Sequence, residues 1–487
     1  MKRIIFFAGL MFFSFSTNAQ VDRIVFWLHG LGGDNAAFSR VVTATTFNTS
    51  TPIPNYPPRK IWSEQLGYEQ QTYSLDGAAS YIHTKIALAD GINNTYGLAT
   101  KQNNFIISHS QGGLVARAVD RIYTLNPWLE RRVNGIVTFG SAHQGAQIIN
   151  SRANNLFPQF INEACTELTA GPVKEKVQTN FFLRWFVTDK MVESVLQPLC
   201  TVLSGTVPLA FTDFSQPISN EYKVGAPELT SLNNFSSTVN KVAFYGVEDE
   251  QTQAWRVLTS LKNKPNDYPA FEADDDTELV TAVNENLQKY QAKVTYWQQA
   301  YNNLGSFYCS WWKWMTKPGF CTLNDAYINS ERNNAKNLRD AWQQGVNWWI
   351  TGNDRFRLLT GALTYQQVST TQYECYCDEY DYNGNLISSW INFVVNPADC
   401  QSIPSIPIYC NLTGNTYQYT DYIQVSKPSD GIVTAESASD FPGCLPQNKK
   451  EMIGSNHQQM RNDRNTKERL KELFRGDYGS YFITNAR

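Results

Sequence analysis

Short apolar runs alternate with amphipathic segments through the first half of the chain. Four of these runs end in a glycine or in a loop of small residues, which is typical of buried strands; they lie at 23–29, 104–108, 133–139 and 241–246. Helical spacing of apolar residues follows at 78–93 and 112–123. Strands that alternate with helices predict βαβ units, so we expect an α/β fold whose mostly parallel sheet is flanked by helices.

Two long stretches interrupt this alternation. The first, at about 144–240, contains amphipathic pieces at 181–186 and 191–202 and is predicted to form a helical lid. The second, at 249–427, is predicted to be an inserted α+β subdomain. It holds helical patterns at 274–303 and 329–349, a Trp-rich patch between them, and a Tyr-rich β-like segment at 373–390 with a turn at Asn383-Gly384-Asn385. A charged helix is expected at 462–474, near the C-terminus.

The N-terminus is typical of a secretory signal peptide. Lys2 and Arg3 precede an almost wholly apolar run at 4–15, and small residues end at Ala19. We therefore predict cleavage after Ala19 and export to the periplasm or the medium. The predicted organisation is a signal peptide at 1–19, a core at 20–248, the insertion at 249–427, and the rest of the core at 428–487.

Composition narrows the possible partners. The 487 residues carry a formal net charge of −3, so no nucleic-acid or anionic-membrane partner is called for, and the oligomeric state stays open. All nine cysteines lie after the predicted signal, which favours disulfides with at least one cysteine unpaired. Cys375 and Cys377 have a spacing that a metal site could also use, but no histidine is near them and disulfides are favoured. We expect neither a metal nor an organic cofactor.

Ser110 is the predicted nucleophile. It lies in SHSQGG at 108–113, between a buried run and an amphipathic helix. A strand that enters a helix through so tight a turn exposes the middle side chain, and small neighbours are needed because strand and helix nearly touch. Ser108 replaces the glycine usual at the first position of this motif. In this context a serine–glycine turn without chemistry is the less favoured interpretation.

A glycine-rich loop, HGLGG at 29–33, follows the first predicted strand. Glycines allow the main chain to approach a substrate closely, and acyl transfer needs main-chain N–H donors at the developing oxyanion. We predict the N–H groups of Leu31 and Gln111 as the two donors of this oxyanion hole. The alternative is a plain glycine loop without a catalytic role.

The general base is predicted from chain order. Hydrolases with such a turn carry serine, acid and histidine in that order along the chain, which among the five histidines favours His457. The acid has two candidates, Asp430 and Asp249, and chain order favours Asp430. A carboxylate at that place orients the imidazole and stabilises its protonated form.

Five motifs together resemble the serine lipases of the α/β-hydrolase superfamily: HGLGG at 29–33, SHSQGG at 108–113, FGSAHQG at 139–145, SDGIV at 429–433 and IGSNHQQM at 453–460. Bacterial triacylglycerol lipases, GPI inositol-deacylase-like lipases and lecithin–cholesterol acyltransferase are most similar in these motifs. In those families a D-G-x-V loop supplies the acid and an H-x-x-M segment the histidine, which implies Asp430 and His457. The resemblance covers roughly residues 21–250 and 426–460, and the insertion has no counterpart in it.

The predicted function is cleavage of carboxylic esters, of lipid or acyl type, through an acyl-enzyme, with a lipid interface as a possible partner. Two alternatives stay open. One is an acyltransferase or phospholipase on the same triad. The other is a non-catalytic secreted protein that binds a glycan or lipid through the aromatic insertion. Composition favours an ordinary core, held by disulfides, as the role of those aromatic residues.

Overall fold

The computed structural model describes residues 23–44, 62–95, 104–178, 216–262, 278–402 and 407–482. The predicted signal peptide and the amphipathic pieces at 181–186 and 191–202 lie outside these residues. The chain divides into two compact units, the first made of Met1–Ala362 with Pro428–Arg487 and the second of Leu363–Lys427. Among the described residues, no helix is both long enough and apolar enough to cross a bilayer.

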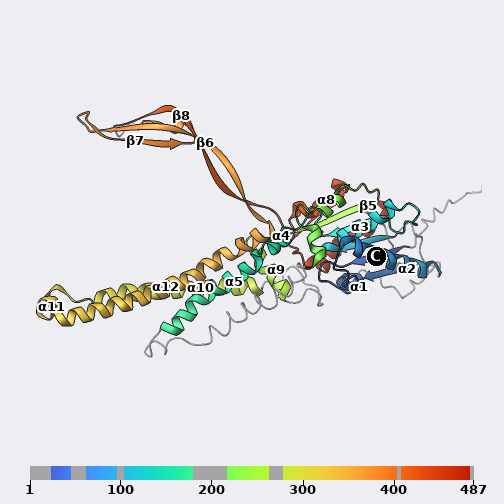
Figure 1. Ribbon diagram of the computed structural model, residues 1–487, viewed down its shortest axis with the longest axis horizontal. Helices are drawn as coiled ribbons and strands as arrows, with labels where there is room; N and C mark the ends of the chain where they lie inside the picture. The colour runs from blue at the N-terminus through green and yellow to red at the C-terminus, as the bar shows by residue number, and fades with distance from the viewer. Residues whose placement is uncertain are drawn as a thin grey trace, which may run out of the picture. The chain divides into compact units, whose positions relative to one another are not determined.

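A six-stranded parallel sheet forms the centre of the first unit (Figure 1). Its order is β2 (Trp62–Leu66), β1 (Ile24–Leu28), β3 (Phe105–His109), β4 (Gly135–Phe139), β5 (Asn240–Val247) and β9 (Lys449–Ile453). The crossover connections include α2 (Leu75–Thr95) and α3 (Gln111–Leu125). The predicted α/β fold with a mostly parallel sheet is therefore confirmed.

Alternate residues of the central strands enter two separate apolar clusters, as the two-residue period of a strand requires. On one face Phe26 and Ile106 pack with residues of α2 and α3. On the other face Trp27 and Ile107 pack with α1 (Ser39–Ala44) and α14 (Arg464–Arg475). Burial on both faces explains why these strands appear in the sequence as unbroken apolar runs.

The two edge strands, β2 and β9, are absent from the sequence-based prediction. Their sequences, WSEQL and KKEMI, are mostly polar, and in β9 Met452 is the one buried residue. An edge strand has solvent along one side, so it needs fewer apolar residues. These two segments therefore become strands through their hydrogen bonds to β1 and β5, and not through their local sequence.

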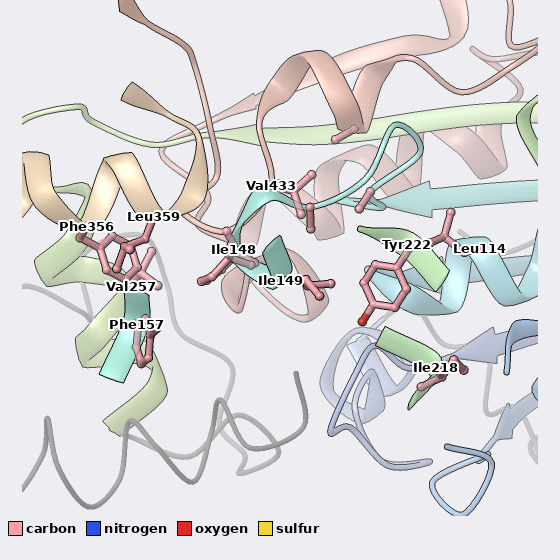
Figure 2. Packing of buried hydrophobic residues seen from close by; sticks show 14 of the residues in the cluster. Leu114, Ile148, Ile149, Phe157, Ile218, Tyr222, Val257, Phe356, Leu359 and Val433 are labelled. Carbon is pink, nitrogen blue, oxygen red and sulfur yellow. The ribbon is translucent and has the colours of Figure 1, made fainter. Parts of the chain in front are cut away.

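Helices contributed by both predicted insertions pack together within the first unit. α5 (Leu156–Gln178) lies against α12 (Pro318–Thr360), and α12 also packs along α10 (Glu278–Leu304). Three buried contacts join them: Tyr290 Oη donates to Leu168 O at 2.6 Å, and Glu175 accepts from Lys293 Nζ at 2.7 Å and from Trp342 Nε1 at 2.8 Å. Figure 2 shows an apolar group where the start of α5 meets the end of α12. It contains Phe157 of α5, Phe356 and Leu359 of α12, and Val257.

α4 (Gln147–Ala153) and α8 (Pro227–Asn233) also come from the predicted lid, and α9 (Gln253–Lys262) opens the predicted insertion. In Figure 2, Ile148 and Ile149 of α4 are buried in the same core as Val433. The described part of the predicted lid is thus packed into the first unit. That the lid opens at a lipid interface remains a prediction, and residues 179–215 of the lid lie outside the described residues.

The second unit is a three-stranded antiparallel sheet in the order β7 (Leu386–Val394), β6 (Leu363–Tyr380) and β8 (Ile408–Ser426). The predicted turn at Asn383-Gly384-Asn385 joins β6 to β7, and Gly384 has a φ of 82° there. Disulfides Cys375–Cys400 and Cys377–Cys410 hold the sheet, as favoured over a metal site. A third disulfide, Cys309–Cys321, lies in the first unit.

We predicted that the aromatic residues of the insertion form an ordinary core, and this prediction is wrong for the Trp-rich patch. Trp297, Trp342, Trp348 and Trp349 of α10 and α12 are buried. Trp311 and Trp312, in contrast, are 71% and 68% exposed. The sequence gives both sets the same aromatic signal, and only the packing of α10 on α12 separates them.

Candidate active site

Ser110 lies in the sharp turn between β3 and α3. Its φ of 54° and ψ of −127° are strained for a residue with a side chain, as a nucleophile elbow requires. The turn requires a glycine at position 112, because a Cβ there would lie 2.4 Å from the main-chain oxygen of His29, the residue after β1. Ser110 N donates to Phe139 O at 2.9 Å, which fixes the turn against β4.

Three side chains from distant parts of the chain meet at this turn. His457 Nε2 lies 2.9 Å from Ser110 Oγ, and His457 Nδ1 lies 2.7 Å from Asp430 Oδ2. Asp430 is fully buried, and His457 is 4% exposed. The three residues form a serine–imidazole–carboxylate chain of hydrogen bonds, the geometry used to remove a proton from a serine hydroxyl.

The loop after β8 holds the carboxylate in place. Asp430 Oδ1 accepts from the main-chain N–H groups of Ile432 and Val433 at 2.9 and 2.7 Å, which leaves Oδ2 for the histidine. The main-chain N–H of His457 donates to Asp430 O at 2.9 Å. Gly431, with φ of 90°, allows the loop to close on itself. Asp430 and His457 are therefore joined by a main-chain hydrogen bond as well as by the contact between their side chains.

The glycine loop after β1 lies directly against Ser110. A Cβ on Gly30 would be 2.8 Å from Ser110 Cβ, so this approach requires a glycine. Leu31 follows at the exposed turn, which Gly33 N closes on Gly30 O at 3.1 Å. Gln111 is the first residue of α3, where main-chain N–H groups have no acceptor within the helix. The oxyanion hole formed by the N–H groups of Leu31 and Gln111 stays a prediction.

Residues 24–197 match the family model described as palmitoyl protein thioesterase. The match covers less than half of the chain and is a likeness to this family. No curated protein matches the chain at the level of sequence. The chain is also similar to solved structures at low identity. A phospholipase from Legionella pneumophila is 11% identical with a TM-score of 0.26, and the match covers 47% of this chain and 39% of that one. The match thus spans well under half of that phospholipase.

Two further solved structures are similar over about the same share of the chain. A mature lipase from Bacillus licheniformis is 12% identical with a TM-score of 0.27, and the match covers 47% of this chain and 68% of that one. A type II thioesterase from yersiniabactin biosynthesis is 14% identical with a TM-score of 0.26, with 48% and 76% covered.

The remaining histidines have structural partners. His143 is fully buried, lies 3.2 Å from Thr138 Oγ1 through Nε2, and stacks on Phe441 at 4.3 Å between ring centroids. The His83 ring lies against the Tyr123 ring, with 5.1 Å between the ring centroids. Neither histidine is hydrogen-bonded to Ser110 among the described residues, in agreement with the choice of His457 by chain order.

Two histidines support the site without being hydrogen-bonded to Ser110. His109 Nε2 lies 2.7 Å from His457 O, so the residue before Ser110 holds the main chain of His457. His29 lies under the glycine loop: its Nδ1 is 2.7 Å from Gly30 O, and its Nε2 accepts from Tyr68 N at 3.1 Å. The sequence places both residues in the right motifs but gives no sign of these contacts.

The sequence left open whether Ser108 fits a position where glycine is usual and whether Asp249 is the acid. Ser108 Oγ donates to Val137 O at 3.0 Å and is fully buried, so the serine fits where a glycine is usual. The carboxylate of Asp249 accepts from Gln251 N at 3.0 Å, and its exposed side chain holds the turn before α9. No hydrogen bond or ion pair joins Asp249 to His457 within the described ranges.

Gly140 is a contact residue of the site to which sequence reasoning gave no role. A Cβ on Gly140, whose φ is 58°, would be 2.5 Å from Met460 Cε and 3.0 Å from Asp430 Oδ2. Met460, the methionine of the H-x-x-M segment, is fully buried in the apolar cluster on that face of the sheet. The positive φ and the lack of a side chain allow β4 to end beside Asp430 and His457. For Gly140 the available signal was a glycine directly after a predicted central strand.

Buried histidines should make the protein less stable in mild acid. Burial lowers the pKa of His109 and of His143 well below the ordinary value of 6.5. The unfolded chain therefore binds protons that the folded chain does not, and the free energy of unfolding falls as the pH drops below about 6.5. Each histidine contributes a slope of at most about 1.4 kcal/mol per pH unit.

Urea unfolding at pH 7 and at pH 5.5 measures this loss. The variant His143→Gln should show a shallower dependence on pH than the wild type, because one of the histidines with a lowered pKa is removed. Equal free energies of unfolding at both pH values would contradict the prediction.

Proposed function

We propose that the hydrolase cleaves lipid acyl esters, thioesters included, with Ser110 as nucleophile, His457 as general base and Asp430 as the acid that orients it. The hydrogen-bonded chain from Ser110 Oγ through His457 to Asp430 Oδ2 is the single observation that carries this proposal. The match to a palmitoyl protein thioesterase model adds the acyl chain and the sulfur ester as candidate substrate features.

The reaction proceeds in two halves. His457 Nε2 takes the proton of Ser110 as Oγ attacks the acyl carbonyl, and the main-chain N–H groups of Leu31 and Gln111 donate to the oxyanion. The protonated imidazole, stabilised by the Asp430 carboxylate, then gives its proton to the leaving alcohol or thiol. Water, deprotonated by His457, releases the acid from the acyl-enzyme.

The proposed location is outside the cytoplasm, after removal of residues 1–19. Three disulfides within the described residues are compatible with an oxidising compartment. The mass of the mature N-terminus, expected to begin at Gln20, tests the cleavage site directly.

Active-site labelling followed by a substrate series tests the proposed chemistry. We expect a fluorophosphonate probe to label Ser110 of the mature protein, and p-nitrophenyl esters from acetate to palmitate to be cleaved with a maximum at a definite chain length. Acyl thioesters of the same lengths, followed by release of thiol, show whether sulfur esters are preferred. A folded protein that is neither labelled nor active would favour the non-catalytic binding protein instead.

Added acceptors distinguish the acyltransferase and the phospholipase from the simple hydrolase. An acyltransferase would give a new ester when a long-chain alcohol is supplied, and the yield of free fatty acid would drop correspondingly. A phospholipase would release lysophospholipid from phosphatidylcholine at a rate comparable with its best p-nitrophenyl ester.

A further inference from the structure

The turn between α10 and α12 exposes a dense group of large apolar side chains. This segment, residues 305–324, is called the hairpin tip; it includes α11 (Trp311–Thr316) and the first turns of α12 (Figure 1). Six of its apolar side chains are each at least 61% exposed: Phe307, Trp311, Trp312, Met315, Phe320 and Leu323. Single exposed apolar residues are common on protein surfaces, but a contiguous group of this kind indicates a binding surface.

The hairpin tip is held in a defined shape. Cys309–Cys321 joins its two sides. The Asp325 carboxylate accepts from Cys309 N at 3.0 Å and from Trp314 Nε1 at 3.1 Å, which fixes α11 against α12. Because these contacts already order the main chain, binding through the exposed side chains loses little conformational freedom.

The charge of the tip is opposite to that of the whole chain. Residues 305–324 contain Lys313 and Lys317 and no acidic residue, whereas the chain has a formal net charge of −3. With Asp325, which follows directly and is hydrogen-bonded to the tip, two lysines and one aspartate leave a net charge of +1, so the absence of an anionic-membrane partner inferred from the whole chain does not extend to this segment. Trp is enriched where membranes meet water, and Lys can reach lipid headgroups while its stem contacts apolar groups.

These features favour a bilayer over the other partners of an aromatic surface. A glycan site needs polar side chains around its aromatic rings, but Trp311 and Trp312 are accompanied by exposed Met315 and Phe320. A second copy of the chain would bring two cationic tips together, which is unfavourable. Anionic headgroups above an apolar layer complement both the lysines and the apolar side chains.

We propose that the hairpin tip inserts its tryptophans into the interfacial layer of a lipid bilayer that carries anionic headgroups. Lys313 and Lys317 pair with those headgroups, while Trp311, Trp312 and Met315 enter the boundary between headgroups and acyl chains. This inference goes beyond the proposed ester hydrolysis and stands without it, since none of these residues belongs to the Ser110 site.

Flotation with vesicles tests the proposal on the full mature protein. The vesicles are made of ether-linked phosphatidylcholine, alone or with an equal part of ether-linked phosphatidylglycerol, so that no acyl ester is available for cleavage. We expect binding to the anionic vesicles, and about tenfold weaker binding for the double variant Trp311→Ala/Trp312→Ala. Trp128→Ala is the matched control, because Trp128 is 77% exposed outside the tip and its loss should leave binding unchanged.

The lysines are tested separately. Lys313→Gln/Lys317→Gln should weaken binding to anionic vesicles by about fivefold per lysine and should have little effect with phosphatidylcholine alone. Added salt should reduce wild-type binding and leave that of the lysine variant almost unchanged.

Two measurements keep these outcomes interpretable. Hydrolysis of a water-soluble short-chain ester and the melting temperature should match the wild type in every tip variant, which excludes misfolding and separates this proposal from the proposed catalysis. Wild-type protein that binds neither vesicle, or a tryptophan variant that binds as well as the wild type, would overturn the inference. Self-association that depends on the tip, seen by sedimentation equilibrium without vesicle binding, would assign the surface to a second copy instead.

Discussion

Replacing Ser110 by alanine should lower the rate of ester hydrolysis by roughly 10⁴- to 10⁶-fold, because among the described residues Ser110 carries the hydroxyl that is hydrogen-bonded to the His457–Asp430 pair. Ser110 Oγ is the hydroxyl 2.9 Å from His457 Nε2, and its turn holds it in that position at the cost of a strained main chain. The measurement is kcat/KM for the best p-nitrophenyl ester, together with fluorophosphonate labelling of the same sample.

The chain provides a matched control for this substitution two residues earlier. Ser108→Ala removes a hydroxyl from the same motif, but this hydroxyl donates to Val137 O and is fully buried. We expect a loss of about 1 kcal/mol in the free energy of unfolding and activity close to that of the wild type. Full activity in Ser110→Ala, or equal loss in both variants, would rule out Ser110 as the nucleophile.

Replacing Asp430 by asparagine should lower kcat by roughly 10⁴-fold while the protein stays folded. The amide keeps one oxygen for the N–H groups of Ile432 and Val433, so the loop is retained. Its NH2 group then faces His457 Nδ1 in place of Asp430 Oδ2. The imidazole is forced to accept at Nδ1 and to carry its proton on Nε2, the tautomer that cannot take a proton from Ser110.

Asp249→Asn decides between the two candidate acids by the same chemical change. Asp249 is exposed, and its carboxylate accepts from Gln251 N at the start of α9. An asparagine can make the same contact, so we expect kcat within about twofold of the wild type. If Asp249→Asn lost most of its activity and Asp430→Asn did not, the proposed acid would have to be replaced.

The geometry explains why the acid can follow so long an insertion. β5 ends beside the loop that contains Asp430, since Glu248 N donates to Ser429 O and Gly454 N donates to Val247 O. The chain therefore returns, after the second unit, to the place it left at the end of β5.

The sequence by itself determined the central strands, the elbow and the order of the candidate site residues. Val25, Ile106 and Val137 lie in strands buried on both faces, so their apolar runs stand out locally. The elbow at Ser110 is local as well, because the tight turn requires small residues next to one another in the sequence. Chain order separated His457 from His143 without any knowledge of their surroundings.

Tertiary structure alone decided the rest, because the deciding contacts join residues far apart in the chain. Chain order favoured Asp430 over Asp249 but left both open, and in the structure Asp430 is the one of the two that is hydrogen-bonded to His457. β9 is polar and becomes a strand because β5 offers it a free edge. Trp348 and Trp311 give the same aromatic signal, yet one is buried where α12 packs in the core of the first unit and the other is exposed at the tip. Whether a tryptophan is buried depends on how the helices pack. The local sequence does not show this, because tryptophan occurs both in cores and on exposed surfaces.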